Sequence, residues 1–419
     1  MIDSYDAVTG SRRPPWACLA AAMRILITGA AGFIGSHIAE AALAAGHVVR
    51  GLDSLAPAVH DGVPGYWPRG AELITADIRD PSAVSRALQG VQAVCHQAAL
   101  VGLGVNLGDL PGYSDVNITG TAVLLDHMGR QQISRLVLAS SMVVYGEGGY
   151  RCAEHGQVRP PARDRADLEQ GRFEARCPWC SADLSTAAVP ESAPLDPRNA
   201  YAVSKVAQEQ LAAVWADLTG GSALALRYHN VYGPRMPRDT PYAGVAAIFR
   251  SALEAGQAPQ VFEDGAQRRD FVHVTDVAAA NLAALQAGQR GRLRAYNIAS
   301  GEPHTIGEMA GALASAFGGP QPQVTGEYRL GDVRHVVASP ELAGRELGFR
   351  AQTRFAAGIA QFARAPLREP ARAAAPLALT RPPVLSGAPW RGEQLIRRPG
   401  SRIRRAAVGA RLPIGHSLG

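Results

Sequence analysis

The apolar positions of the N-terminal half fall into short strand-like runs separated by segments of helical periodicity. Residues 23–28 form the first apolar run, and residues 33–45 then carry apolar side chains at helical spacing. A second apolar run, at 48–52, follows directly. Strands that alternate with helices in this way predict a doubly wound parallel sheet, and a chain of 419 residues can bury a large core. We therefore expect an α/β fold with a smaller C-terminal lobe.

The turn between the first strand and the first helix is rich in glycine. It reads GAAGFIG, with the spacing G-x-x-G-x-x-G and not the commoner G-x-G-x-x-G. Such glycines let the backbone approach a pyrophosphate, which then lies against free N–H groups at the positive end of the helix dipole. Asp53 ends the second strand, 18 positions after Gly35. A carboxylate there accepts a ribose 2′-hydroxyl and repels a 2′-phosphate, which predicts NAD as the cofactor in preference to NADP. The predicted cofactor contacts in this unit are Gly29, Gly32, Phe33, Ile34, Gly35 and Asp53.

A single lysine stands among the 42 basic residues of the chain. This lysine, Lys205, lies four residues after Tyr201, so the two side chains share a face if the segment is helical. An ammonium in that place can lower the pKa of the phenol and still reach a cofactor ribose hydroxyl. On this motif alone, a helix with a chance Tyr/Lys pair remains the alternative.

These motifs together resemble the extended short-chain dehydrogenase/reductase family, in its nucleotide-sugar epimerase/dehydratase branch. The resemblance extends over about residues 23–363 and includes a Rossmann-type fold. Its specificity comes from the order of several further motifs, each weak by itself. These are Asp77-Ile78, His96-Gln97-Ala98-Ala99, Asn117 with Gly120-Thr121, Ser141 four residues before Tyr145-Gly146, Arg227 to Pro234, and Arg269 to Val274.

The resemblance implies an acid–base mechanism at a sugar hydroxyl. Tyr201, with its pKa lowered by Lys205 and by the nicotinamide's positive charge, takes the hydroxyl proton while the hydride on the same carbon passes to NAD. Ser141 hydrogen-bonds the same oxygen, and Lys205 anchors the nicotinamide ribose. In an epimerase, the 4-keto sugar then rotates and takes the hydride back on its other face. The remaining contacts implied are Asp77, Ile78 and Ala98 for the cofactor, and Ser141, Asn230, Arg269 and Arg329 for the nucleotide sugar.

Two absences narrow the reaction within this branch. The 4,6-dehydratases of the family carry Asp-Glu directly after the catalytic Ser/Thr, and the sugar-acid decarboxylases carry a Glu at the first of these positions. This chain has Met142-Val143 there. The expected activity is therefore NAD-dependent nucleotide-sugar 4-epimerisation, of dTDP-L-rhamnose or a related dTDP- or UDP-hexose.

Two other functions remain open at this point. One is an NDP-sugar 4-ketoreductase or dehydrogenase, although Asp53 disfavours NADPH. The other is a non-catalytic nucleotide-binding scaffold, which the intact set of Ser141, Tyr201 and Lys205 disfavours. The resemblance also implies a homodimer, formed by the helix after Asp115 and the helix of Tyr201 to Leu218.

The segment between Tyr145 and Glu191 is longer than in most members of the family. It contains Cys152-x-x-His155 and Cys177-x-x-Cys180, two ligand pairs that can form a closed tetrahedral zinc site. Such a zinc would be structural and would stabilise a polar loop with little core of its own. A redox Cys-x-x-Cys pair and an unliganded loop with surface thiols are the alternatives.

The formal net charge of +6 is concentrated at the C-terminal end. From Arg364 onward there are 11 Arg and 2 Glu, and residues 1–22 carry two Arg and two Asp, which leaves a net charge of −3 for residues 23–363. This distribution argues against nucleic acid as a partner. No apolar run reaches the roughly 20 residues of a membrane helix, and the N-terminus lacks a secretory apolar segment. Five cysteines are too few and odd in number for a disulfide framework, so we expect a cytoplasmic protein without a membrane partner.

The expected organisation combines these observations. It consists of a disordered extension (1–22), an NAD-binding Rossmann domain (23–230) that contains the Cys/His insertion (146–191), a mainly nucleotide-sugar-binding lobe (231–363) and a disordered basic tail (364–419).

Overall fold

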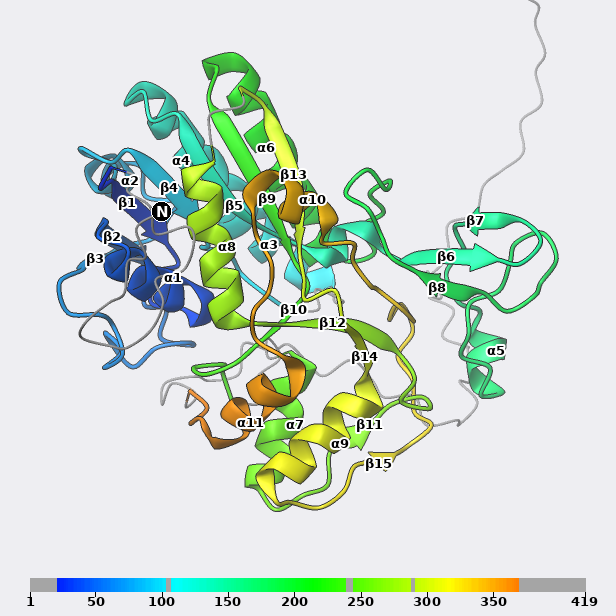
Figure 1. Cartoon of the computed structure of the whole chain (residues 1–419). Helices are drawn as coiled ribbons and strands as arrows, with labels where there is room; N and C mark the ends of the chain where they lie inside the picture. The colour runs from blue at the N-terminus through cyan, green and yellow to red at the C-terminus, as the bar shows by residue number, and fades with distance from the viewer. Residues whose placement is uncertain (1–20, 103–106, 239–243, 288–290, 369–419) are drawn as a thin grey trace, which may run out of the picture. The chain divides into compact units, whose positions relative to one another are not determined.

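A seven-stranded sheet with the strand order β13-β9-β5-β4-β1-β2-β3 is the largest sheet in the described residues (Figure 1). The computed structural model describes residues 21–102, 107–238, 244–287 and 291–368. Every neighbouring pair in this sheet is parallel. The strand order reverses between β1 and β4, so the predicted α/β, Rossmann-type doubly wound sheet is confirmed. The strands are β1 (Arg24–Thr28), β2 (Val48–Asp53), β3 (Glu72–Thr75), β4 (Ala93–His96), β5 (Arg135–Ser141), β9 (Ser222–Tyr228) and β13 (Leu293–Ile298).

Helices cover both faces of the central sheet, which explains why its strands are continuously apolar. In β1, Ile25 and Ile27 pack with one helical layer, whereas Leu26 packs with the other. The first layer contains α1 (Phe33–Ala44), α8 (Val274–Gln286) and α10 (Glu341–Leu347), and the second contains α2 (Pro81–Ala87), α4 (Gly120–Arg130) and α6 (Ala200–Thr219). The helices cover the two faces of the sheet, so the loops that follow the strands lie at the carboxyl ends of the strands. These loops carry the candidate site.

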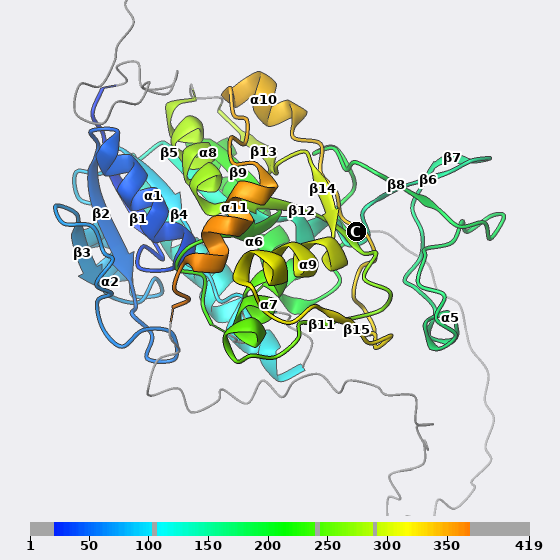
Figure 2. The same cartoon turned by 60° about the horizontal axis from the view of Figure 1, so that its bottom comes forward.

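A second core lies around Tyr232, Phe249, Phe271 and Phe362. Three helices that lie side by side form this core: α7 (Val245–Glu254), α9 (Ile306–Phe317) and α11 (Phe355–Arg364) (Figure 2). The short strands of this part of the chain are β10 (Asn230–Tyr232), β11 (Gln260–Val261), β12 (Arg268–His273), β14 (Pro303–Thr305) and β15 (Gln323–Val324). Although α8 and β13 fall within residues 231–363, they join the central sheet and its helical layer.

The segment between Tyr145 and Glu191 folds around its own small core. Its antiparallel sheet has the order β7-β6-β8, from β6 (Gly149–Cys152), β7 (Gly156–Val158) and β8 (Ser185–Ala187), and it also contains the short helix α5 (Arg165–Glu169). We call residues 146–191 the insertion.

The remaining short elements precede α4 and follow β5. They are the 3₁₀ helix η1 (Leu107–Asp109), α3 (Leu110–Tyr113), the π-helical turn η2 (Ser114–Thr119) and the 3₁₀ helix η3 (Met142–Tyr145). None of the helices in the described ranges has the length and apolar character required to cross a membrane. The expectations for the two termini concern residues 1–20 and 369–419, which lie outside the described residues.

Candidate functional site

The glycine turn forms a tight cradle where the strand order reverses. Gly29 has φ = +63°, and a Cβ there would lie 2.7 Å from the backbone nitrogen of Ala98. A Cβ on Gly35 would lie 2.2 Å from the carbonyl oxygen of Gly29. Gly32 is the N-cap of α1, and no side chain caps this helix. Uncapped N–H groups behind a close-packed glycine turn fit the pyrophosphate of a dinucleotide.

Asp53 stands at the end of β2, beside this cradle. Its carboxylate accepts the backbone N–H groups of Ala31 and Leu55, both at 2.9 Å. These bonds fix the direction of the carboxylate and leave lone pairs for a further donor. The ribose contact remains a prediction, but the bond to Ala31 already ties the acid to the glycine turn.

The other predicted cofactor contacts lie on neighbouring strand ends. Ala98 donates its N–H to Thr28 Oγ1 at 3.1 Å, so the loop after β4 is pinned to the end of β1. Ile78 is buried in the core beneath α4. Both carboxylate oxygens of Asp77 accept from Arg79, and this pairing lowers the pKa of Asp77. The adenine contacts of Asp77 and Ile78 remain predictions.

The structure brings Ser141, Tyr201 and Lys205 together. Ser141 is the last residue of β5, whereas Tyr201 and Lys205 lie in the first two turns of α6. This helix begins where Asn199 caps it, with its side chain accepting the N–H of Ala202 at 2.8 Å. Tyr201 and Ser141 share a hydrogen bond, and Lys205 Nζ lies 5.8 Å from the centroid of the Tyr201 ring.

Burial controls the protonation of this set. It raises the pKa of Tyr201 to about 12, against the opposing effect of the hydrogen bond with Ser141. It lowers the pKa of Lys205 to about 7, and the negative charge of Glu209 opposes that shift. Burial outweighs the predicted lowering of the Tyr201 pKa by Lys205, so this pKa lies above its ordinary value. The reason is that burial removes both groups from water, and Lys205 donates instead to the carbonyl oxygen of Ala139 at 2.9 Å.

Sequence reasoning missed a buried ion pair behind these residues. Glu209 accepts from Arg227 at 2.7 and 3.0 Å and from the hydroxyl of Ser140 at 2.5 Å. Both members of the pair are almost fully buried. Glu209 lies one helical turn after Lys205, so the spacing Lys-x-x-x-Glu indicated an acid near the lysine but not its pairing with Arg227.

Of the four predicted nucleotide-sugar residues, Asn230 and Arg269 lie on the paired strands β10 and β12, Arg329 lies in the loop after β15, and Ser141 lies at the end of β5. In the parallel pairing of β10 with β12, Asn230 lies opposite Phe271, two positions from Arg269. Burial lowers the pKa of Arg269 and raises the pKa of Asp332. The positive charges of Arg329 and Arg269 oppose the shift of Asp332, so both guanidinium groups lie near this carboxyl group. Asn230 Oδ1 and Arg329 Nε are buried and have no hydrogen-bond partner among the described residues. Unpaired buried polar atoms are costly, so these two fit contacts to a ligand.

The two predicted metal-ligand pairs converge in the insertion. Cys152 and His155 lie at the turn between β6 and β7, and Cys177 and Cys180 lie at a second turn. Their ligand atoms all lie within 4.8 Å of one another. His155 Nδ1 is 3.5 Å from the sulfurs of Cys152 and Cys177, and the sulfurs of Cys152 and Cys180 are 3.6 Å apart. A tetrahedron with Zn–S bonds of about 2.3 Å has edges of about 3.8 Å, so the arrangement fits zinc.

Comparison with known proteins agrees with this geometry. The sequence profile of the NAD dependent epimerase/dehydratase family matches residues 25–165 and 181–299, and thus interrupts within the insertion. A dTDP-L-rhamnose 4-epimerase from Burkholderia thailandensis is 35% identical over 346 residues, which are 81% of this chain and 93% of that protein. A UDP-glucose 4-epimerase from Mycolicibacterium smegmatis is 31% identical over 342 residues, or 81% of this chain and 97% of that protein.

A solved structure shares the fold and contains the expected cofactor. The Thermus thermophilus UDP-glucose 4-epimerase in complex with NAD superposes with a TM-score of 0.64 at 32% identity, over 81% of this chain and 98% of that one. The family match covers most of the chain, and the relatives are matched over nearly their whole length. The chain therefore belongs to the NAD dependent epimerase/dehydratase family.

Proposed function

We propose that this protein is an NAD-dependent nucleotide-sugar 4-epimerase. The observation that carries the proposal is the convergence of Ser141, Tyr201 and Lys205 at the carboxyl ends of the strands, beside the glycine cradle. Matched relatives from two bacteria are 4-epimerases by name. A binding scaffold has no use for a buried, hydrogen-bonded Tyr/Ser pair, so the geometry favours an enzyme.

The chain's own residues supply the proton chemistry. Bound NAD would accept a hydride from C4 of the sugar and return it. Tyr201, as phenolate, takes the proton of the C4 hydroxyl, and Ser141 holds that oxygen. Lys205 carries the positive charge that favours the phenolate, which burial otherwise opposes.

Met142 and Val143 argue against dehydration and decarboxylation. They form the start of η3, directly after Ser141. Neither side chain can exchange a proton, so no carboxyl group stands at the positions from which the family's dehydratases and decarboxylases act. Proton transfer at C4 alone needs no carboxyl group at position 142 or 143.

The nucleotide sugar is dTDP-L-rhamnose or a related dTDP- or UDP-hexose. The names of the relatives from Burkholderia thailandensis and Mycolicibacterium smegmatis support this range. Asn230 and Arg329 each present a buried polar atom without a partner in the part of the chain that the structure describes, and Arg269 and Arg329 both lie near Asp332. Arg side chains suit a diphosphate because their donors match its oxygens.

A structural zinc ion held by Cys152, His155, Cys177 and Cys180 is part of the proposal. The four cysteines in the described ranges form no disulfide, which suits a reducing compartment such as the cytoplasm. The core of the insertion consists of few residues, among them Tyr150, Val158 and Leu184. A metal would therefore contribute a large share of its stability.

A homodimer is the proposed assembly. Val203, Val214 and Leu218 lie on one face of α6 and are 49%, 56% and 82% exposed. Residues 11 and 4 positions apart point in nearly the same direction on a helix, so the three form one apolar stripe. Packing this stripe and the neighbouring α4 against a second copy would remove apolar surface from water.

The decisive test follows C4 of the sugar without added cofactor. The purified protein is incubated separately with dTDP-L-rhamnose, UDP-glucose and UDP-galactose, and each sugar is followed by NMR. A C4 epimer formed without added NAD is the expected result and identifies the sugar. Turnover only with stoichiometric NAD or NADH would indicate the dehydrogenase or ketoreductase, and no turnover with any substrate would favour the scaffold.

A further inference from the structure

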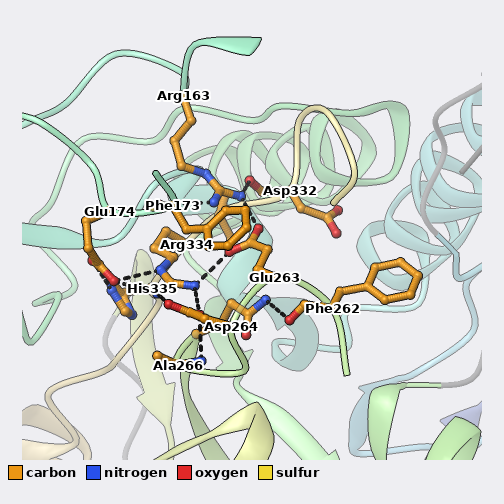
Figure 3. A network of polar contacts seen from close by, with 12 residues as sticks. Arg163, Phe173, Glu174, Phe262, Glu263, Asp264, Ala266, Asp332, Arg334 and His335 are labelled. Atoms are coloured by element: carbon orange, nitrogen blue, oxygen red, sulfur yellow. Dashed lines mark hydrogen bonds and ion pairs between the residues drawn. The ribbon is translucent and has the colours of Figure 1, made fainter. Parts of the chain in front are cut away.

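Arg334 joins the insertion to the candidate nucleotide-sugar lobe (Figure 3). Its side chain is 0% exposed and donates to three carboxylates. Glu174, which belongs to the insertion, accepts at 2.5 and 2.9 Å. Glu263 accepts at 2.7 Å, and Asp264 accepts twice at 2.8 Å. A buried guanidinium requires such partners, so the position of Arg334 depends on the insertion.

Arg163 forms a second connection from the insertion to the same lobe. It pairs with Glu263 at 2.8 Å, with side chains that are 5% and 3% exposed. It also donates to the backbone oxygen of Asp332 at 2.7 Å. Glu263 has φ = +53°, a strained conformation for a residue with a side chain. The ion pairs of Arg163 and Arg334 hold Glu263 from two sides and thereby stabilise this conformation.

His335 is held by the insertion at three points. The backbone N–H of Gly148 donates to its carbonyl oxygen, and its own N–H donates to the hydroxyl of Tyr150, both at 3.1 Å. Its ring Nε2 lies 2.9 Å from Glu174. Hydrogen bonds from His335 and Arg334 lower the pKa of Glu174 to about 2, although burial acts in the opposite direction. Glu174 is therefore ionised at neutral pH and available to both partners.

The residues held in this way position candidate substrate ligands. Glu263 directly follows Phe262, whose ring lies 4.8 Å from the guanidinium of Arg329. The carbonyl oxygens of Val333 and Arg334 each accept a hydrogen bond of 2.8 Å from Arg269. The orientation of Arg269 is thus set by a backbone segment that the insertion holds.

We propose that the insertion is a positioning element of the nucleotide-sugar site: Arg163 and Glu174 hold Arg269, and through Phe262 also Arg329, in the geometry that binds the nucleoside diphosphate. The identity of this ligand rests on the proposed function. Arg163 and Glu174 act through other residues, so their loss weakens nucleotide binding and leaves the chemical step nearly unchanged.

The Cys/His cluster belongs to this positioning element. Glu174 lies three residues before Cys177, and the backbone N–H of Leu184 donates to the oxygen of Ala175 at 2.9 Å. The hairpin that carries Cys177 and Cys180 therefore begins at Glu174. Loss of the metal-ligand cluster weakens nucleotide binding for the same reason as loss of Glu174.

The test measures binding of dTDP and of UDP to the full-length, NAD-loaded protein by calorimetry. The variants are Arg163→Met, Glu174→Gln and, as a matched control, Arg172→Ala, whose ion pair with Asp167 lies within the insertion. We expect Kd to rise about tenfold for Arg163→Met and for Glu174→Gln, within the range seen for residues that act on a ligand indirectly. The control should stay within about twofold, and kcat should change by less than about twofold in all three. Bound NAD, metal content and melting temperature are recorded for each protein.

Three results overturn the positioning role. One is an unchanged Kd for both nucleotides in Arg163→Met and Glu174→Gln, and another is a loss of kcat at constant Kd. The third is binding of neither nucleotide by the wild-type protein, which also removes the proposed function. Nucleotide binding without epimerisation, in contrast, contradicts the proposed reaction alone. If Arg163→Met does not fold, Arg163→Lys keeps the charge, and its Kd should lie between those of wild type and Glu174→Gln.

Discussion

Lys205 donates a hydrogen bond of 2.9 Å to the carbonyl oxygen of Ala139, which ties the single lysine of the chain to the strand that ends at Ser141. Burial lowers the pKa of Lys205 to about 7, while the charge of Glu209 opposes the shift. His96 lies near the same ammonium and is neutral, because burial lowers its pKa to about 3. Burial at this position therefore disfavours the charged form of a residue whose proposed role requires the charge.

The stability of the cofactor-free protein should consequently depend on pH through Lys205. Between pH 7 and 10.5, the unfolded chain binds this proton more strongly than the folded chain does. The contribution of Lys205 to the free energy of unfolding therefore rises with pH across that window. Lys205→Met removes the contribution, so the variant should be more stable than wild type at pH 7, and the difference should shrink toward pH 10. Denaturant unfolding at several pH values measures it, and a difference that stays constant with pH would contradict the burial effect.

Replacing Tyr201 with Phe removes only the hydroxyl that the proposed reaction uses. Turnover should fall by roughly 10²- to 10⁴-fold, the usual contribution of a positioned acid or base. Calorimetry should still detect dTDP or UDP binding, and NAD should still copurify. Tyr296→Phe is the matched control, because that hydroxyl donates to Glu346 at 2.8 Å outside the site, and its turnover should match wild type. Equal activity in both variants would count against the role of Tyr201.

A contact between Tyr66 and Arg235 should slow the release of NAD. The Tyr66 hydroxyl donates to the carbonyl oxygen of Ala31 within the glycine turn at 2.8 Å, and the guanidinium of Arg235 lies 4.8 Å from its ring centroid. Arg235 in turn pairs with Glu40 of α1 at 2.5 Å. Tyr66→Ala should therefore lose NAD during gel filtration, which the ratio of released NAD to protein measures. Arg130→Ala, which removes an exposed pair on α4, is the control, and retention equal to the control would refute the contact's role.

The sequence predicted those parts of the fold that rest on local patterns. The alternation of apolar runs and helical segments predicted the doubly wound sheet, and the order of motifs predicted which strand ends meet. Residues that interact through sequence-distant partners were not accessible in this way. No pattern in the sequence distinguishes Arg334 from the other arginines. Its contact with Glu174, 160 positions away, follows only from the fold.

In the candidate site, too, local spacing was predictable from the sequence and contacts between distant residues were not. The helical spacing of Tyr201 and Lys205 correctly placed both side chains beside each other, and the spacing of the Cys/His pairs predicted a convergent cluster. The protonation state of Tyr201 was not predictable, because it depends on how completely the surrounding elements exclude water. The Arg227–Glu209 pair was missed for a related reason, since a motif does not reveal which member of it faces the core.

Two glycine-to-alanine changes in helices should have opposite effects. A Cβ on Gly35 in α1 would lie 2.2 Å from the carbonyl oxygen of Gly29, so Gly35→Ala must displace the glycine turn. We expect it to lose copurifying NAD and to lower the melting temperature. A Cβ on Gly311 in α9 would meet nothing within 4 Å, so Gly311→Ala should raise the free energy of unfolding by about 0.5–1 kcal/mol. Retained NAD in Gly35→Ala would show that the close packing at this turn is not required for cofactor binding.

The Cys/His cluster predicts one zinc ion per chain. Protein purified without chelator should contain close to one equivalent by mass spectrometry of the metal, and Cys152→Ser or Cys180→Ser should lose most of it. Both variants should also melt at a lower temperature, because the small core of the insertion cannot replace the metal. Cys95→Ala is the control: this thiol is buried in the central core, so the change costs stability but should leave the zinc content intact. Equal zinc in all three variants, or none in wild type, would exclude the metal site. Cys152 and Cys177 are buried, which counts against the alternative of surface thiols. Thiol titration tests the redox alternative, because a redox pair should lose free thiols on mild oxidation, whereas unliganded thiols without a redox role should keep them.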